Sequence, residues 1–262
     1  MRHIRCRPIL TNTDSSETLP VLFQDEHMVA VNKPSGLLVH RSPIDRHETR
    51  FALQLVRDQI GQRVYPVHRL DKPTSGVLLF ALNSDIAREL SAQFASHTVD
   101  KQYLAVVRGY CPEEGEIDHP ITDKPDKMID GLRSQPRPAQ EALTRYQRLA
   151  TVEVPYAVDR YPQARYSLVA LQPVHGRKHQ LRRHMKHLGY PMIGDAKYGK
   201  GVHNRFFHTH YGCDRLLLAC VGMTLLHPVS GEPVVLEADI GQGFERVLEA
   251  LGWASVLSGS AR

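Results

Sequence analysis

The stretch VYPVHRLDKPTSGVLLFAL, residues 64–82, joins a charged loop that contains a proline to a strongly apolar run. The run at 76–82 is nearly continuous, which predicts a strand buried in the middle of a sheet. In the loop, the residue before Pro73 favours extended backbone, and residues 74–76 are typical of a turn. Asp71 is therefore expected on a stiff loop at the edge of a buried strand, where functional residues often lie.

Strand and helix signals are mixed along the rest of the chain without regular alternation. Paired strands are expected on either side of a polar turn at 24–27, and apolar spacing predicts helices at 48–61 and 83–97. Residues 111–140 are polar and rich in proline, which indicates an irregular segment with one short strand. This mixture favours the α+β class with a largely antiparallel sheet. Further strands are expected at 101–110, 164–173, 215–228 and 232–240, a basic helical segment at 176–189, and a short helix at 244–253.

The composition is that of a globular protein with a substantial core, since 42% of the 262 residues are hydrophobic and 23% are charged. Residues 1–18 are expected to form a flexible extension, and 19–262 a single domain. No run approaches the ~18 apolar residues of a membrane span, and no signal peptide is evident, so we expect a cytoplasmic protein without membrane contact. The formal charge of +5 is compatible with a nucleic-acid partner.

Asp71 is a lone carboxylate among basic and histidine side chains, with His68, Arg69 and Lys72 beside it. The simplest interpretation is an ion pair in a surface loop, since such pairs are common and contribute little. The alternative is that the cations attract a polyanion and the carboxylate carries out chemistry on it. Both interpretations fit the loop taken alone.

Two further segments offer groups that could bind a nucleic acid. Tyr103 falls in the strand expected at 101–110, where an aromatic ring either fills the core or stacks on a nucleobase. The segment at 176–189 is dense in cations, which fits either a phosphate-binding surface or a solvated basic face. Its cations are Arg177, Lys178, Arg182, Arg183 and Lys186.

Histidines are frequent in the second half of the chain and raise the possibility of a metal site. The sequence contains no H-E-x-x-H motif and no cysteine pair beside them, so no metal is expected. It also lacks G-x-G-x-x-G and G-x-x-x-x-G-K-[ST], so no nucleotide cofactor is expected. A metal-dependent hydrolase is nevertheless kept as a rival interpretation. The histidines concerned are His175, His179, His184, His187, His203, His208 and His210.

Three motifs follow one another along the chain: HRLDKPTSGVLLFAL, KQYLAVV and LQPVHGRKHQLRRHMKHLGYPMIGDAKYG. Together they resemble the RluA family of pseudouridine synthases. The similarity runs from Leu19 to at least Asp239, and the first motif is highly specific. Within the family, FQDEHMVAVNKPSGLLVHRS, VRDQIG and TVEVP resemble most closely the branch that acts on uridine 65 of tRNA.

The resemblance implies the fold and a role for each candidate residue. The family fold is a mixed, mostly antiparallel sheet with flanking helices and a central basic cleft. Asp71 corresponds to the catalytic aspartate, Tyr103 to the tyrosine that packs against the target uracil, and Arg177 to the basic residue paired with the carboxylate. Leu181 would line an apolar pocket around it, and Arg69 and His68 would contact substrate or hold the loop. Lys178, Arg182, Arg183 and Lys186 remain candidates for RNA phosphate contacts.

The implied reaction detaches uracil from ribose at N1, rotates the base and reattaches it through C5, without a cofactor. Asp71 must be ionised, and the Arg177 guanidinium would keep it so. The base must leave its stack, at a cost that stacking on Tyr103 and phosphate contacts would offset. The expected partner is RNA, most simply tRNA, bound by a monomer. Alternatives are a synthase acting on ribosomal RNA and a non-catalytic RNA-binding module.

Overall fold

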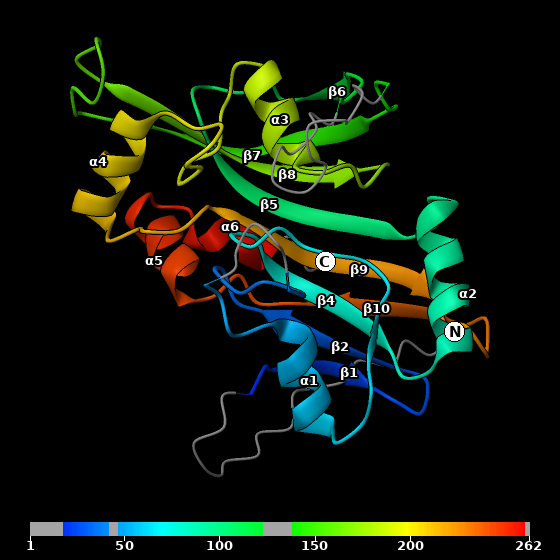
Figure 1. Cartoon of the computed structure of the whole chain (residues 1–262). Helices are drawn as coiled ribbons and strands as arrows, with labels where there is room; N and C mark the ends of the chain where they lie inside the picture. Colours follow the sequence, from blue (N-terminus) through cyan, green and yellow to red (C-terminus); the bar gives the residue numbers. More distant parts are fainter. Residues whose placement is uncertain (1–17, 42–46, 123–137, 260–262) are drawn as a thin grey trace. The chain divides into compact units, whose positions relative to one another are not determined.

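The computed structural model describes residues 18–41, 47–122 and 138–259 (Figure 1). They form two compact units. The first contains the chain up to Lys101 together with Cys220–Asp239, and the second contains Gln102–Ala219 and the chain from Ile240 onward. The predicted extension at 1–18 lies outside the described residues except for its last residue. The division of the chain into this extension and one catalytic domain remains a prediction.

The first unit contains a sheet with the strand order β1-β2-β4-β9, in which β3 also pairs with β4 and β10 with β9. Every residue of β4 is buried, which confirms the central strand predicted at 76–82. The pairs β1–β2, β2–β4, β3–β4 and β9–β10 are all antiparallel. The strands are β1 (Val21–Gln24), β2 (Met28–Lys33), β3 (Tyr65–Pro66), β4 (Ser75–Ala81), β9 (Leu218–Leu226), whose first residues belong to the second unit, and β10 (Pro233–Glu237).

Two helices complete the first unit, and both were predicted. Helix α1 (Ala52–Ile60) ends at Gly61, whose φ of 70° is the left-handed conformation that glycine adopts without strain. Helix α2 (Ser84–Ala95) begins after Asn83, whose side chain accepts hydrogen bonds from the backbone N–H groups of Asp85 and Ile86. The core beside β2 and β4 is built from Leu19, Val29, Val31, Leu37, Val39, Ala52, Val56, Val64, Leu78 and Phe80.

The second unit contains strands in the order β5-β8-β7-β6, and these neighbours are also antiparallel. The strands are β5 (Asp100–Arg108), which begins in the first unit, β6 (Glu114–Asp118), β7 (Leu143–Val154) and β8 (Ala164–Pro173). The helices are α3 (Gln180–His187), α4 (Gly201–Tyr211), α5 (Gln242–Ala250) and α6 (Ala254–Gly259). Buried residues of β5, β8 and α3 share one core cluster, which includes Ala105, Val107, Val169, Leu171, Leu181 and Met185.

The fold class is confirmed as α+β with a mostly antiparallel sheet, but three segments differ from expectation. Strand β7 was not predicted, because charged and polar residues such as Arg145 occupy its exposed positions and a bulge at 148–150 interrupts the alternation. Helix α4 was not predicted, because it has no side-chain N-cap and consists largely of histidine, aromatic and β-branched residues. Helix α3 is shorter than the predicted 176–189.

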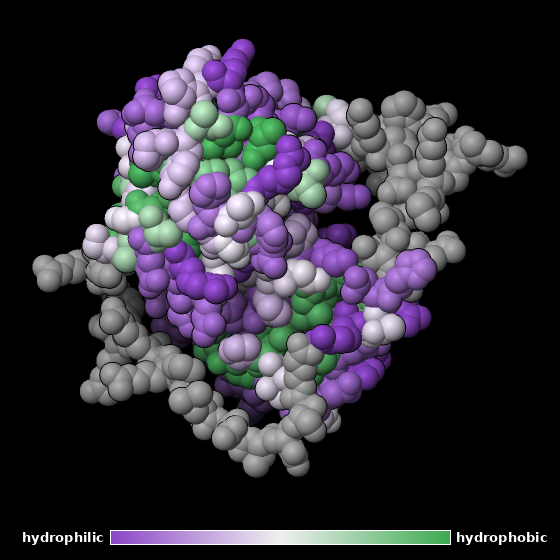
Figure 2. All heavy atoms as spheres, turned by 90° about the vertical axis from the view of Figure 1, so that its left-hand side faces the viewer, coloured by the Kyte–Doolittle hydropathy of each residue, from purple (hydrophilic) through white to green (hydrophobic). Residues whose placement is uncertain are grey.

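On the face shown in Figure 2, hydrophilic side chains predominate and hydrophobic ones occupy smaller areas. Among the helices of the described ranges, none combines the length and the apolar character needed to span a bilayer. The predicted central basic cleft remains a prediction.

Candidate active site

Asp71 lies in the first unit, on the loop between β3 and β4. The Asp71 carbonyl accepts a hydrogen bond from the Thr74 N–H at 3.0 Å, which closes a turn across the intervening Lys72 and Pro73. Asp71 is half-buried, and the chain becomes buried at Thr74 and stays so through β4. The carboxylate is therefore attached to a short, closed turn next to a fully buried strand, as the sequence predicted.

Lys33 is hydrogen-bonded to this turn, a contact that the sequence did not indicate. Its side chain is fully buried at the end of β2. Its Nζ donates to the carbonyl oxygens of Pro34 and Leu37 at 2.8 Å, and of Lys72 at 3.2 Å. A buried ammonium group is costly unless hydrogen bonds compensate it, so these three oxygens account for its position. Lys33 thus connects the loop at 34–37 to the residue that follows Asp71.

The loop at 34–37 makes two further bonds to the same turn. The Gly36 N–H donates to the Lys72 carbonyl at 2.8 Å, and the Ser35 hydroxyl donates to the Pro73 carbonyl at 2.7 Å. Gly36 has a φ of 89°, a conformation that a side chain would strain. The Lys72 side chain pairs with Glu48 at 2.9 Å. These bonds hold the backbone on both sides of Pro73 in place.

His68 and Arg69 were each predicted either to contact the substrate or to hold the loop, and the structure shows different surroundings for the two side chains. His68 accepts the Leu79 N–H through Nε2 at 2.9 Å and stacks on Phe94. Burial, with a contribution from the positive charge of Lys101, lowers the pKa of His68 to about 3. A neutral imidazole bonded to β4 is a structural element of the loop. The Arg69 side chain is exposed, and its role in contacting substrate remains a prediction.

Tyr103 and Leu181 lie in the second unit and are brought together there. Tyr103 is partly buried on β5 and packs against the core cluster that contains Leu181, from α3, and Leu171, from the neighbouring strand β8. The aromatic ring therefore stands at the edge of an apolar surface. This arrangement fits both of the roles considered for it, since one side of the ring contacts core residues while part of the residue remains accessible.

Arg177 precedes helix α3 and is held in a turn. Gln180 fixes this turn, because its Oε1 accepts the Arg177 N–H and its own N–H donates to the Arg177 carbonyl, each at 3.0 Å. The Gln180 Nε2 also donates to the Leu143 carbonyl of β7 at 3.0 Å, and the Arg177 Nε donates to the Glu141 carbonyl at 3.0 Å. The sequence analysis did not identify Gln180, because a glutamine among basic residues matches no known motif.

Arg182 requires a correction, because it is not placed to bind phosphate. The side chain of Arg182 is buried, with 6% of the residue exposed, and its guanidinium donates two hydrogen bonds of 2.8 Å to the Asp195 carboxylate. Although burial raises the pKa of Asp195, the bonds from Arg182 and from backbone N–H groups give a net lowering. The pair is a buried structural ion pair. Arg182 lies three residues before the apolar Met185 and therefore on the same face of α3, a spacing that could have indicated its burial.

The other basic candidates of this segment differ in exposure. Lys178 and Lys186 are exposed, and Arg183 is half-buried with a bond of 3.0 Å from its guanidinium to the Thr122 carbonyl. The Lys186 ammonium also lies 5.9 Å from the centre of the Tyr198 ring. Contacts of Lys178, Arg183 and Lys186 with RNA phosphate therefore remain predictions that their exposure permits.

The histidines considered for a metal are engaged in separate contacts. His184 is buried between the Thr144 hydroxyl, 2.9 Å from Nδ1, and the His119 carbonyl, 3.0 Å from Nε2. His175 accepts the Leu143 N–H at 3.0 Å, and His187 stacks on His119. Across 18–41, 47–122 and 138–259, no three side chains of the metal-binding kinds gather as a metal site requires.

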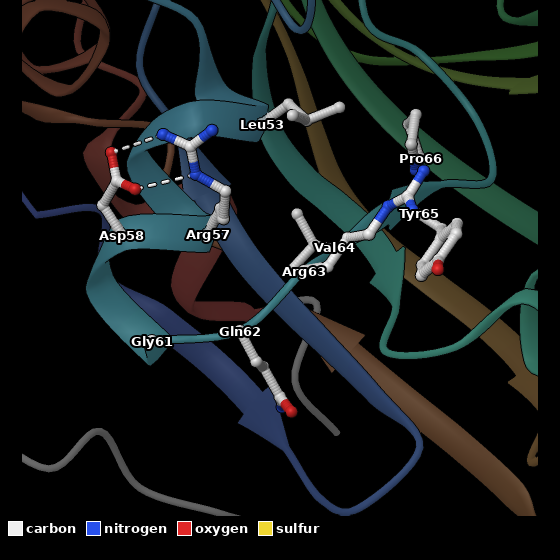
Figure 3. Close-up of a pocket in the computed structure, with 9 residues that line it drawn as sticks. All are labelled: Leu53, Arg57, Asp58, Gly61, Gln62, Arg63, Val64, Tyr65 and Pro66. Carbon is white, nitrogen blue, oxygen red and sulfur yellow. Dashed lines mark hydrogen bonds and ion pairs between the residues drawn. The ribbon is translucent and has the colours of Figure 1, made fainter.

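A separate concavity of about 770 Å³ lies at the C-terminal end of α1, in the first unit (Figure 3). It is lined by Leu53 and residues 57–58 of the helix and by the segment 61–66, which ends in β3. The Arg57 and Asp58 side chains pair with each other at its edge. Asp71 is not among the lining residues, so this concavity is distinct from the turn that carries the carboxylate.

Residues 27–187, more than half of the chain, match the family model for RNA pseudouridylate synthase. The chain belongs to this family. The matched segment contains Asp71, Tyr103, Arg177 and Leu181, and the resemblance inferred from the motifs is confirmed.

Curated relatives named tRNA pseudouridine synthase C are similar over about nine-tenths of the chain. The protein of Vibrio cholerae is 48% identical over 91% of this chain and 98% of its own length, and that of Yersinia pestis is 52% identical over 91% and 93%. The Pectobacterium carotovorum protein is 52% identical over 91% of this chain, which spans only 64% of that longer relative.

Solved structures agree with the fold. Human RNA pseudouridylate synthase domain containing 4 superposes with a TM-score of 0.66 and 28% identity, covering 88% of this chain and 92% of the human one. Human RNA pseudouridylate synthase domain containing 1 gives a TM-score of 0.65 at 24% identity, covering 92% and 98%, which supports the fold alone.

Proposed function

We propose that this protein converts a specific uridine of tRNA, at position 65, into pseudouridine, with Asp71 as the catalytic carboxylate. The observation that carries the proposal is the match to the synthase family over 27–187, which includes every residue assigned a role at the target base. The relatives named tRNA pseudouridine synthase C support tRNA as the substrate. A monomer acting in the cytoplasm, with no obligate protein partner, completes the proposal.

The proposed roles follow from the chemistry. The bond between N1 and the ribose C1′ breaks, C5 forms the new bond to C1′, the hydrogen at C5 leaves as a proton, and N1 takes up a proton. Ionised Asp71 acts on the base or on the ribose, and Arg177 stabilises its negative charge. Tyr103 stacks on the extruded uracil, and Leu181 supplies apolar surface. No electron transfer or group donor enters this balance, so no cofactor is needed.

Tritium release from tRNA labelled at uridine C5 tests the proposal. We expect release by the wild-type protein and none by Asp71→Asn, with tRNA affinity changed less than about threefold, because the loss concerns a reacting group. The control Asp85→Asn alters an exposed carboxylate of α2 and should release tritium normally. Mapping the product nucleotide then checks position 65.

Two rivals predict other outcomes of the same assay. A non-catalytic RNA-binding module would bind tRNA without releasing tritium in any variant. A ribosomal RNA synthase would release tritium only from labelled ribosomal RNA. Retained tritium release by Asp71→Asn would exclude the assigned role of Asp71.

A further inference from the structure

A second pocket, of about 390 Å³, lies within the second unit near the C-terminal end of β5 and the start of β8. Its lining combines two cations, Arg108 and Arg165, with the Tyr161 ring, the His203 imidazole and the Asp159 carboxylate. Arg108 is five residues from Tyr103, which along a strand corresponds to about 16 Å. The pocket is therefore separate from the surface around Tyr103, although one RNA could contact both.

His203 supplies an unsatisfied polar atom at this pocket. Only 3% of the residue is exposed, and its Nδ1 lies 2.9 Å from the hydroxyl of the fully buried Tyr166. Among the buried side-chain atoms of the described residues, its Nε2 is the one without a hydrogen-bond partner. If the Tyr166 hydroxyl donates to Nδ1, Nε2 carries the hydrogen and is the single unsatisfied donor. The opposite assignment would leave both the phenol hydrogen and Nε2 unsatisfied.

The charges around His203 favour an anion. The Arg165 and Lys200 side chains have carboxylate partners, Glu153 and Asp159, at 2.6 and 3.1 Å. Arg108 has no such ion pair with any described residue, so its charge is the excess one at the pocket. Burial, followed by the charge of Arg108, lowers the pKa of His203 to about 4, which keeps the imidazole a neutral donor near pH 7.

Exposed aromatic rings accompany these donors. Tyr161 lines the pocket and is 58% exposed, and Tyr110 is 41% exposed with the Arg165 guanidinium 5.1 Å from its ring centre. An inorganic anion alone would make no use of an exposed ring. Aromatic rings beside cations are the combination that binds single-stranded nucleic acid, through base stacking and phosphate contacts.

We propose that this pocket binds a second nucleotide of the substrate RNA, outside the target uridine. Arg108 and the His203 Nε2–H bind its phosphate, and Tyr161 stacks on its base. The inference rests on the proposed function in that it takes the ligand to be RNA, and it adds a contact that positions the RNA without touching the reacting atoms. A free nucleotide offers the same chemistry, so the experiment must separate the two sources.

The experiment measures tRNA affinity and its salt dependence for Arg108→Met and Tyr161→Ala. Loss of one phosphate contact should weaken binding about tenfold for Arg108→Met and reduce the slope of log K against log[salt] by about 0.7 to 0.9. Tyr161→Ala should weaken binding about fivefold or more with the slope unchanged, because stacking is not electrostatic. The control Arg145→Met removes an exposed cation of β7 that pairs with Glu116 and should match the wild type.

Both variants also serve in the tritium assay, where KM should rise while kcat stays within about twofold. Tyr161 is so exposed that its truncation leaves the core intact, so this variant tests the pocket even if Arg108→Met folds poorly. Unchanged tRNA affinity in Tyr161→Ala and in folded Arg108→Met would overturn the inference. A second result would also overturn it: AMP raises the unfolding temperature of the wild type but not of the two variants, and the variants bind tRNA as tightly as the wild type does. If the wild type bound tRNA but released no tritium, the proposed function would fail while the affinity data still decided the pocket.

Discussion

At the scale of single residues, the buried ammonium group of Lys33 binds the backbone carbonyl of Lys72, the residue that follows Asp71. Lys33→Met removes its bonds to the Pro34, Leu37 and Lys72 carbonyls while keeping most of the volume. We expect kcat for tritium release to fall about 10- to 100-fold, because small displacements of a reacting group have effects of this size. Affinity for tRNA should change little, since Lys33 is inaccessible.

The control for Lys33 is Arg88→Met, which removes an exposed cation of α2 that pairs with Asp85. It should leave kcat and stability within error of the wild type, as exposed ion pairs contribute little. Wild-type kcat in Lys33→Met would show that the turn at 71–74 keeps its position without this residue.

At the scale of elements, helix α3 carries adjacent arginines with different functions. Arg182→Met leaves the buried Asp195 carboxylate without its partner, so the free energy of unfolding should fall by about 3–5 kcal/mol. Arg183→Met should cost less than about 1 kcal/mol but reduce the salt slope of tRNA binding by about 0.7 to 0.9. Urea unfolding and affinity at several salt concentrations measure both effects.

Equal stabilities of the two variants would contradict the structural role of Arg182. A normal salt slope in Arg183→Met would remove Arg183 from the RNA-binding surface. The contrast also illustrates why cation density in a sequence overstates a binding surface: one helix face is turned into the core, and a cation there needs a buried partner.

At the scale of the whole molecule, buried neutral histidines predict an acid-sensitive fold. Burial lowers the pKa values of His68, His184 and His203, to about 3 for His68 and about 4 for His203. Below pH 6.5 the unfolded chain therefore binds more protons than the folded one, and stability falls as the pH decreases. Between pH 7.5 and 5, His68 and His203 should each account for about 2 kcal/mol.

Urea unfolding at pH 7.5, 6.5, 5.5 and 5 measures this decline. His68→Phe should lower stability at pH 7.5 but make the decline shallower, whereas His208→Gln, on an exposed side chain, should leave its slope unchanged. Burial raises the pKa values of Asp25 and Asp195, but hydrogen bonds outweigh it and lower both below 3.8. The stability that these carboxylates provide is therefore lost only as the pH falls toward and below 3.8, outside the range measured. A flat profile between pH 7.5 and 5 would contradict the burial of these histidines.

The sequence by itself determined the fold class, the buried strand β4, the capped helices α1 and α2, and the turn that carries Asp71. These depend on local patterns, namely an apolar run, N- and C-cap residues and a proline turn, which act within a few residues of the chain. The motif at 68–76 also pointed to the family, because its residues are specific as a set.

Only the tertiary structure decided which candidate side chains are used in structural hydrogen bonds and ion pairs and which stay accessible. The bond from Leu79 makes His68 structural, Asp195 removes Arg182 from the surface, and Lys33 reaches Lys72 across 39 positions of the chain. Such contacts join segments that are distant in sequence, and their partners leave no local pattern. The same holds for β7 and α4, whose conformations depend on packing against neighbours more than on the propensities of their own residues.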